Sequence, residues 1–250
     1  MTKKPVILTF TSGKGGVGKS FIAANIAYIM SVRYNTLIWD ADIDFPNQHI
    51  MFGVEPPFRM NDYYSKKRDI KKYFYKLNNK LFLAAGQPAI GYDKEDGELI
   101  IFKTLEDVIK ENLFEIIILD TGSGLSAETI QSCLVADLVN VVVSDEPTSL
   151  LDAFALIKVL SNKMDLKKVF LVANNMVDFD DVKEISKKFN LATQKFLNQQ
   201  IDVLDYINYD RNIRYSIMKQ EPYVKIYPHT EAAKALHSLN DKILRGFKLN

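Results

Sequence analysis

A short glycine-rich segment near the N-terminus has the residue types and spacing of a phosphate-binding loop. Residues 13–20 read GKGGVGKS, which fits the pattern G-x-x-x-x-G-K-S. Glycines let such a loop fold tightly and point backbone N–H groups at phosphate oxygens, and the helix that follows adds its positive N-terminal end. We expect Lys19, in a solvent-facing loop, to neutralise phosphate charge and the Ser20 hydroxyl to ligate Mg²⁺. The predicted nucleotide contacts in this segment are Gly13, Gly15, Gly16, Val17, Gly18, Lys19, Ser20 and Phe21.

Carboxylates follow two apolar, strand-like stretches further along the chain. The stretch WDADIDFPN carries Asp40, Asp42 and Asp44, and the stretch FEIIILD ends in Asp120. Hydrolysis of a nucleoside triphosphate needs a metal held by hard oxygen ligands and a water oriented for in-line attack. Aspartates also end strands simply because they form turns. Together with a phosphate loop, however, they predict a site for Mg²⁺ and the attacking water.

A second lysine, Lys14, follows the first glycine of the loop, although one lysine is enough to bind a phosphate. The plain alternative is a solvated loop residue. With this lysine, KGGVGKS resembles the deviant Walker A motif of the MinD/ParA group of P-loop ATPases. In that group the lysine reaches across a sandwich dimer to the partner's nucleotide, much as an arginine finger acts in trans. The resemblance implies that the chain binds ATP and Mg²⁺, forms a homodimer with ATP, and uses Lys14 and Lys19 in catalysis.

The same resemblance implies roles for the carboxylates. Asp40, Asp42 and Asn47 match the group's D-x-D pattern followed by an asparagine. Asp40 is then expected to hold Mg²⁺ through water and Asp42 to position or activate the attacking water. Asp120, as the Walker B acid, is expected to bind Mg²⁺. Asp44 is interpreted as a solvated loop residue.

Later segments extend the resemblance over essentially the whole chain. Gly122 and Gly124 stand in the position of the switch II turn, whose backbone could sense the γ-phosphate. The stretch EPTSLLDAFALIKVL places Asp152 in the dimer-facing position of the group. VANN places Asn174 where the group reads the adenine, and Asn208 stands where the group usually has proline.

The elements that must position these residues can be predicted from the alternation of apolar, β-branched runs with helical patterns. This alternation predicts a doubly wound α/β fold, with a mainly parallel sheet and helices on both faces, in a single P-loop ATPase domain over residues 1–250. Ligands of such sheets bind beyond the carboxyl ends of the strands, where the predicted site residues stand. The predicted strands are 5–11, 36–41, 81–86, 115–120, 138–144, 168–174 and 201–207.

Composition excludes several classes of function. The chain has 250 residues, 47% of them hydrophobic, and a net charge of +1, so bulk charge gives no case for nucleic acid and no specific nucleic acid is expected. A single cysteine, Cys133, excludes a disulfide framework and cannot supply the thiolates of an iron–sulfur cluster. No signal peptide or membrane span is recognisable, so we expect a cytoplasmic protein, with peripheral binding at the inner face of the membrane as the alternative.

Two segments allow a second interpretation. Residues 63–76, YYSKKRDIKKYFYK, could bind nucleic acid or anionic lipid, but we favour a solvated helix whose aromatic side chains pack on the domain. Residues 232–250 have apolar side chains at helical spacing, which predict a last core-packing helix more than a membrane anchor. We therefore expect weak or no autonomous membrane binding.

Two branches of the MinD/ParA group fit the sequence. DTGSG, with Gly122 where MinD has proline, and the EPTSLLDAFALIKVL stretch resemble the flagellar-number branch known as FlhG, FleN or YlxH. This branch implies control of flagellar number or placement, with a flagellar GTPase or a basal-body protein as partner. Its members often begin with an extension that stimulates the GTPase, and a strand starting at residue 5 leaves no room for one. A MinD-type division-site or other cargo-positioning ATPase is the alternative. A metabolic P-loop enzyme is a rival class, which Lys14 disfavours.

Overall fold

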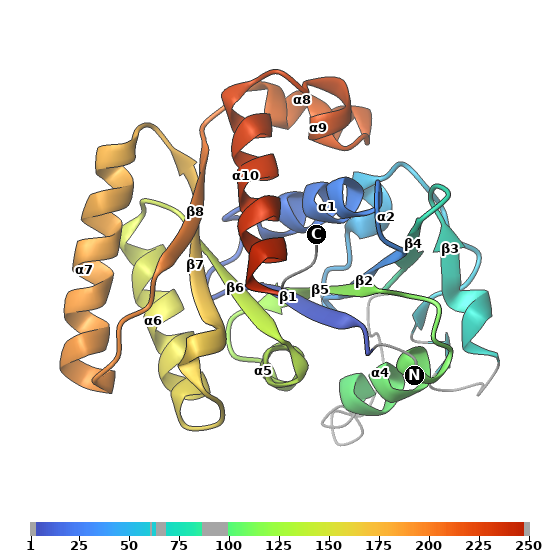
Figure 1. The fold of residues 1–250 in the computed structure, drawn as a ribbon, viewed down its shortest axis with the longest axis horizontal. Coiled ribbons are helices and arrows are strands. Elements are labelled where there is room, and N and C mark those ends of the chain that lie inside the picture. The colour runs from blue at the N-terminus through green and yellow to red at the C-terminus, as the bar shows by residue number, and fades with distance from the viewer. Residues whose placement is uncertain (1–3, 61, 64–68, 87–99, 248–250) are drawn as a thin grey trace.

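One eight-stranded sheet runs through the part of the chain that the computed structural model describes, residues 4–60, 62–63, 69–86 and 100–247 (Figure 1). The strands lie in the order β3-β4-β2-β5-β1-β6-β7-β8, and every neighbouring pair is parallel except β3 with β4. The predicted doubly wound, mainly parallel sheet is thereby confirmed. The strands are β1 (Val6–Ser12), β2 (Thr36–Ala41), β3 (Phe74–Lys76), β4 (Leu81–Ala84), β5 (Ile116–Ser123), β6 (Leu138–Val143), β7 (Val169–Met176) and β8 (Val203–Asn208).

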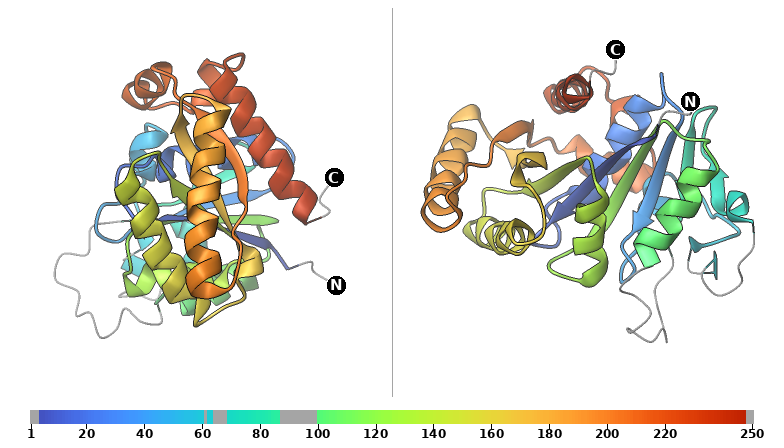
Figure 2. Two further views of the ribbon diagram at one scale, coloured as in Figure 1. Left: turned by 90° about the vertical axis from the view of Figure 1, so that its left-hand side faces the viewer. Right: turned by 60° about the horizontal axis from the view of Figure 1, so that its bottom comes forward.

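Helices cover both faces of the sheet (Figure 2). Helices α1 and α10 contact each other on one face, and α4, α5, α6 and α7 lie on the other. The α-helices are α1 (Lys19–Met30), α2 (Gln48–Met51), α4 (Ile100–Lys110), α5 (Ala127–Val135), α6 (Pro147–Ser161), α7 (Phe179–Leu197), α8 (Asn212–Lys219), α9 (Tyr223–Ile226) and α10 (Glu231–Gly246). In the described ranges, η1 (Ile70–Tyr73) and η3 (Leu166–Lys168) are short 3₁₀ helices.

Side chains of the central strands alternate between two hydrophobic cores. Ile7 and Ile117 belong to the core beneath α4–α7, whereas Leu8 and Ile118 belong to the core beneath α1 and α10. Because both faces are covered, these strands are continuous apolar runs in the sequence. Each buried side chain of this size contributes roughly 1.5–3 kcal/mol to folding. The central strands are therefore a rigid support for the loops at their carboxyl ends.

The basic, aromatic segment 63–76 differs from its predicted form. Residues 64–68 lie outside the described residues; Tyr63 is helical, and residues 70–76 form η1 and the antiparallel strand β3. Tyr73 is fully buried, and the ring centroids of Phe74 and Phe114 are 5.0 Å apart. The aromatic side chains pack on the core as predicted, but Tyr73 does so from η1 and Phe74 from the edge strand β3.

The C-terminal segment forms α10, and its apolar stripe faces the core as predicted. Leu236, Leu239 and Ile243 are fully buried, and the Thr230 hydroxyl caps the helix by accepting from Ala233 N. Residues 248–250, at the end of the possible anchor, lie outside the described residues. Among the described residues, no helix is long and apolar enough to cross a membrane.

Candidate functional site

The phosphate-loop segment connects β1 to α1, at the carboxyl end of a central strand. Gly16 and Gly18 have positive φ angles of 81° and 90°, a left-handed conformation that favours glycine. Gly13 lies so close to α6 that an added Cβ would be 2.2 Å from the backbone carbonyl carbon of Asp152. The loop therefore needs glycine both for its backbone conformation and for close packing.

The N-terminus of α1 is open to an anion. Gly18 is the N-cap residue, no side chain caps the helix there, and the first turn carries no acidic residue. The first N–H groups of a helix have no partner within it and carry the positive end of its dipole. A Cβ on Gly15 would make only an ordinary contact, 3.5 Å from Ser123 Oγ, and one on Gly16 would meet nothing within 4 Å. The protein thus leaves a cradle that fits a phosphate group.

Lys19 is buried, whereas a solvent-facing position was expected from the sequence. It is the first residue of α1, packed against the end of β5, and only 7% of it is exposed. Its Nζ donates to Asp120 Oδ1 at 2.6 Å and lies 3.2 Å from Ser20 Oγ. The residues predicted to bind phosphate and metal therefore meet at one point.

Gln48, which no sequence motif marks, completes this cluster. Its Nε2 donates to Asp120 Oδ2 at 2.7 Å and to the backbone oxygen of Ser20 at 3.0 Å, and the residue is fully buried. Each oxygen of Asp120 thus accepts from one side chain, as a buried carboxylate requires. The only hint in the sequence was its place directly after Asn47.

Asp40 lies beside Asp120, because the two residues pair in register on the adjacent parallel strands β2 and β5. Its Oδ2 accepts from the backbone N–H groups of Asn47 and Gln48, both at 2.8 Å. Burial, and next the charge of Asp120, raise the pKa of Asp40 to about 8. A divalent cation beside the two carboxylates would offset this repulsion. The pair therefore fits the predicted Mg²⁺, and the role of Asp40 through water stays a prediction.

The metal would need ligands beyond acidic side chains. Among the described residues, no group of three or more His, Cys, Asp or Glu side chains could hold a metal ion. Mg²⁺ commonly takes only one or two carboxylates and completes its shell with phosphate oxygens and water. Ser20 and Asp120 suit that pattern, since the Ser20 hydroxyl lies next to Lys19 in the same cluster.

Asp42 is on the loop that follows β2, and it faces the last residues of β5 and the turn after them. Its Oδ1 accepts from the backbone N–H groups of Phe45 at 2.9 Å and Asp44 at 3.2 Å. A Cβ added to Gly122 would lie 3.4 Å from the same oxygen. A hollow of about 90 Å³ between the loop and the turn is large enough for water. This geometry fits the water-positioning role, which stays a prediction.

Lys14 contacts the start of α6 instead of the carboxylates of the site. Its Nζ pairs with the Glu146 carboxylate and hydrogen-bonds Thr148 Oγ1 at 3.0 Å, and its side chain is 33% exposed. A surface ion pair of this kind contributes only about 0.2–1 kcal/mol. Lys14 can therefore leave α6 at little cost. Its action on a partner's nucleotide stays a prediction.

Asn174, predicted to read the adenine, packs against the phosphate loop. Its Nδ2 donates to the backbone oxygen of Val17 at 2.7 Å, and a Cβ on Gly18 would lie 2.2 Å from that nitrogen. Asn174 Oδ1 is buried and has no hydrogen-bond partner among the described residues. This unpaired oxygen could accept from an adenine amino group, so the adenine role stays a prediction. What the structure shows directly is the hydrogen bond from Asn174 to the phosphate loop.

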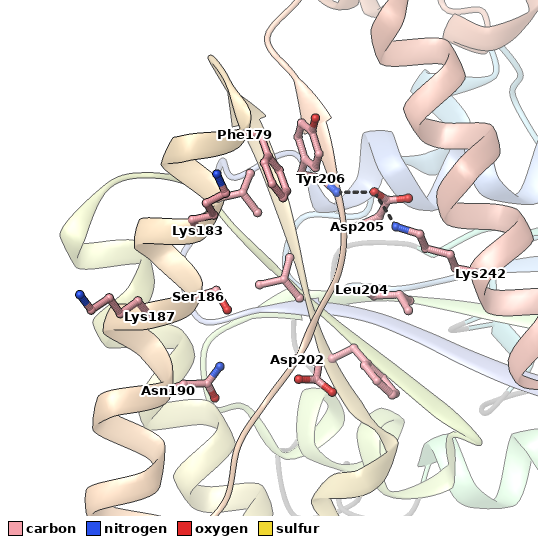
Figure 3. A pocket seen from close by; sticks show the side chains of 13 residues that line it. Phe179, Lys183, Ser186, Lys187, Asn190, Asp202, Leu204, Asp205, Tyr206 and Lys242 are labelled. Atoms are coloured by element: carbon pink, nitrogen blue, oxygen red, sulfur yellow. Dashed lines mark hydrogen bonds and ion pairs between the residues drawn. The ribbon is translucent and has the colours of Figure 1, made fainter.

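A larger hollow lies away from the Lys19–Asp120 cluster and shares no residue with it. It measures about 740 Å³ and lies between α7 and the edge strand β8, with Lys242 of α10 at its rim (Figure 3). Phe179 and Tyr206 stack at one end of it, and Lys242 pairs with Asp205 at 3.1 Å. None of its lining residues belongs to the cluster described above. We assign it no part in nucleotide chemistry.

Comparisons with known proteins agree with this geometry. The family model described as "ParA: NUBPL iron-transfer P-loop NTPase" matches residues 3–244. The chain is 24% identical to the antiactivator FleN of Pseudomonas aeruginosa over 241 residues, which cover 95% of this chain and 85% of FleN. It is 27% identical to the flagellum site-determining protein YlxH of Helicobacter pylori over 227 residues, which cover 89% of this chain and 76% of YlxH.

A solved structure supports the fold. The septum site-determining protein MinD from Pyrococcus horikoshii, complexed with Mg-ADP, matches with a TM-score of 0.76 at 19% identity and covers 98% of both chains. This likeness concerns the fold alone. The family model, in contrast, spans nearly the whole sequence, and the chain carries the loop and the strand-end aspartate that the motif requires. The chain therefore belongs to the ParA family of P-loop NTPases and is an ATPase.

Proposed function

We propose that the chain is a MinD/ParA-type regulatory ATPase that forms a homodimer with ATP and controls flagellar number or placement. The observation that carries the proposal is Lys14, the lysine of a deviant Walker A motif. It takes no part in the Lys19–Asp120 pair and is held by an exposed ion pair with Glu146 and a hydrogen bond to Thr148. A lysine held so weakly at the surface of the loop is free to act on a nucleotide bound by a second copy.

Within one copy, each residue has a distinct task. The N–H groups at the start of α1 and the Lys19 ammonium bind phosphate oxygens. Ser20 and Asp120 hold Mg²⁺, which neutralises phosphate charge when bound, and Asp40 contributes through a water. Asp42 orients the attacking water in the hollow that it shares with the turn after β5. Slow hydrolysis then releases the dimer.

Exposed apolar side chains support a dimer at the same edge of the sheet. These five side chains come shortly after the carboxyl ends of β2, β5, β6, β7 and β8 in the chain, and each of them is more than half exposed. Large apolar side chains exposed at one edge of a sheet favour a contact with another protein there. In an isologous interface each copy would bring its Lys14 to the other copy. These residues are Phe45, Leu125, Leu151, Val177 and Tyr209.

The cellular part of the proposal draws on the names of the relatives, an antiactivator and a flagellum site-determining protein. Iron transfer, which the name of the family model mentions, suits this chain poorly. Its one cysteine, Cys133, is fully buried, and burial raises the pKa of the thiol to about 12. A neutral, inaccessible thiol does not bind iron. We propose a flagellar GTPase or basal-body protein as partner, met in the cytoplasm or at the inner face of the membrane.

The switch can be tested with two substitutions. Asp42→Ala should bind ATP normally, lose about 100-fold or more of its turnover, and accumulate as a dimer on size-exclusion chromatography with light scattering. Adding Lys14→Ala to this variant should return it to a monomer. A monomeric Asp42→Ala protein in saturating ATP would contradict the trans role of Lys14. Turnover that requires a second small substrate would indicate a metabolic enzyme.

The cellular role can be tested separately by deleting the gene in its host. Altered flagellar number or placement, with division septa in their normal positions, is the expected result. Minicells with normal flagella would instead identify a division-site ATPase. That outcome would leave the ATP switch intact and overturn only the flagellar assignment.

A further inference from the structure

Gln48 occupies a position in the site that the proposed roles of the aspartates do not explain. Its carboxamide faces two oxygens at once, Asp120 Oδ2 at 2.7 Å and the backbone oxygen of Ser20 at 3.0 Å. Both oxygens are acceptors, so the end of the amide that meets them must be the NH₂ group. The carboxamide therefore has one orientation, set by the Walker B acid and the phosphate-loop helix.

The donors on Asp120 are of two kinds. Oδ1 accepts from the charged Lys19 ammonium, and Oδ2 accepts from the neutral Gln48 carboxamide. The proposed function draws Lys19 towards the phosphates, which frees Oδ1 for the metal. Gln48 can stay in place during this change, because a neutral amide neither competes with the metal for charge nor repels it. Of the two side chains that donate to Asp120, Lys19 and Gln48, only Gln48 then remains to hold its orientation.

The backbone of Gln48 ties a second element to the same point. Its N–H donates to Asp40 Oδ2 at 2.8 Å, and the neighbouring N–H of Asn47 donates to the same oxygen at 2.8 Å. The loop that carries Asp42 therefore begins just after Asp40 and ends at Gln48. A single buried residue links the metal-binding strand end, the start of α1 and the loop of the predicted water-positioning aspartate.

We infer that Gln48 is a positioning residue for ATP hydrolysis, which orients Asp120 for Mg²⁺ and couples it to the loop of Asp42. The inference rests on the proposed roles of these two aspartates. Residues that orient a metal ligand from behind typically change metal affinity by 10–100-fold when they are replaced. Gln48 should behave in this way although it touches neither the nucleotide nor the metal.

The test replaces Gln48 by methionine, which keeps the length of the side chain and removes the donor. The Mg²⁺ concentration for half-maximal turnover should rise about tenfold or more, and turnover at saturating Mg²⁺ should fall. Affinity for a fluorescent ADP analogue should be unchanged in EDTA, whereas the tightening that Mg²⁺ causes in the unaltered protein should be largely lost. Because this second measurement uses ADP, it does not depend on hydrolysis.

A matched control is Asn25→Leu. Asn25 is also a buried carboxamide with two hydrogen bonds, donating to Phe21 O at 2.8 Å and accepting from Val224 N at 3.0 Å. Its loss should lower thermal stability by a similar amount and leave the Mg²⁺ requirement unchanged. If Gln48→Met does not fold, Gln48→Asn provides the same test, because the shorter amide cannot reach both oxygens.

The outcomes separate the inference from the function on which it rests. An unchanged Mg²⁺ requirement in the Gln48 variant, with or without slower turnover, would overturn the inference. An equal change in Asn25→Leu would also overturn it, because general loosening would then explain the effect. Failure of the proposed function would be visible in the unaltered protein. Its nucleotide affinity and its turnover would then be the same with and without Mg²⁺.

Discussion

Replacement of Gly13 by alanine should destabilise the protein before any nucleotide binds. The added Cβ would lie 2.2, 2.4 and 2.5 Å from three backbone atoms of α6, which belong to Asp152 and Ala153. Backbone atoms inside a helix cannot rotate away, so the loop and α6 must separate by about 1 Å to reach ordinary contact. Overpacking of this kind costs typically about 1–3 kcal/mol, and the rigid neighbours place this case near 3 kcal/mol. For a chain of this size the melting temperature should fall by roughly 6–12 °C.

The control is Gly15→Ala in the same loop. A Cβ there would lie 3.5 Å from Ser123 Oγ, an ordinary contact, and Gly15 does not have a positive φ. This variant should melt within about 2 °C of the unaltered protein, because a tolerated alanine mainly reduces the entropy of the unfolded chain. Thermal unfolding of the ligand-free proteins, followed by circular dichroism, provides the measurement. Equal melting temperatures for the two variants would refute the close-packing explanation of Gly13.

Three further predictions concern buried charge and reactivity. Lys19→Met should abolish nucleotide binding in an equilibrium titration, and it should also destabilise the ligand-free fold by about 3–5 kcal/mol, because it leaves Asp120 buried without its cation. The raised pKa of Asp40 means that its native state holds a proton that the unfolded chain loses above about pH 4, so this carboxyl favours the folded state less as the pH rises towards about 8. The free energy of unfolding of Asp40→Asn, relative to that of the unaltered protein, should therefore rise from about pH 4 to about pH 8 and stay constant above that. Urea titrations at several pH values measure this difference, and a difference that falls over the same range would contradict the prediction. Cys133 should not react with an aromatic disulfide reagent at pH 8 until the protein unfolds, and fast native labelling would contradict its burial.

Most of the sheet could be predicted because its strands are buried on both faces. The first half of β5 is apolar, so this strand stands out as three isoleucines and a leucine followed by the polar residues of its carboxyl end. The edge of the sheet was harder to predict. Strand β3 has only three residues, none of them fully buried, and its lysine and two aromatics mimic a solvated helix. Short edge strands depend on their neighbour more than on their own pattern.

The phosphate loop could be predicted because its function constrains consecutive residues. The partners of its side chains could not, since they come from distant segments. Lys14 meets Glu146 and Lys19 meets Asp120 only after the strands have paired. Gln48 is polar and follows a loop, so its complete burial has no local signal; its place is set by hydrogen bonds to Asp120 and Ser20 that the sequence pattern does not encode.

The charge balance of the buried cluster explains why nucleotide and metal should be bound together. Lys19 pairs with one buried carboxylate, Asp120, whereas burial, and next the charge of Asp120, raise the pKa of the second carboxylate, Asp40. A phosphate that attracted Lys19 alone would leave Asp120 without its partner, and a cation that arrived alone would meet the Lys19 ammonium already in place. Under the proposed function, both changes would be favourable only together, because a cation held by the carboxylates would offset the charge that the lysine leaves. We therefore expect the site to respond to the nucleotide–metal complex more than to either component alone.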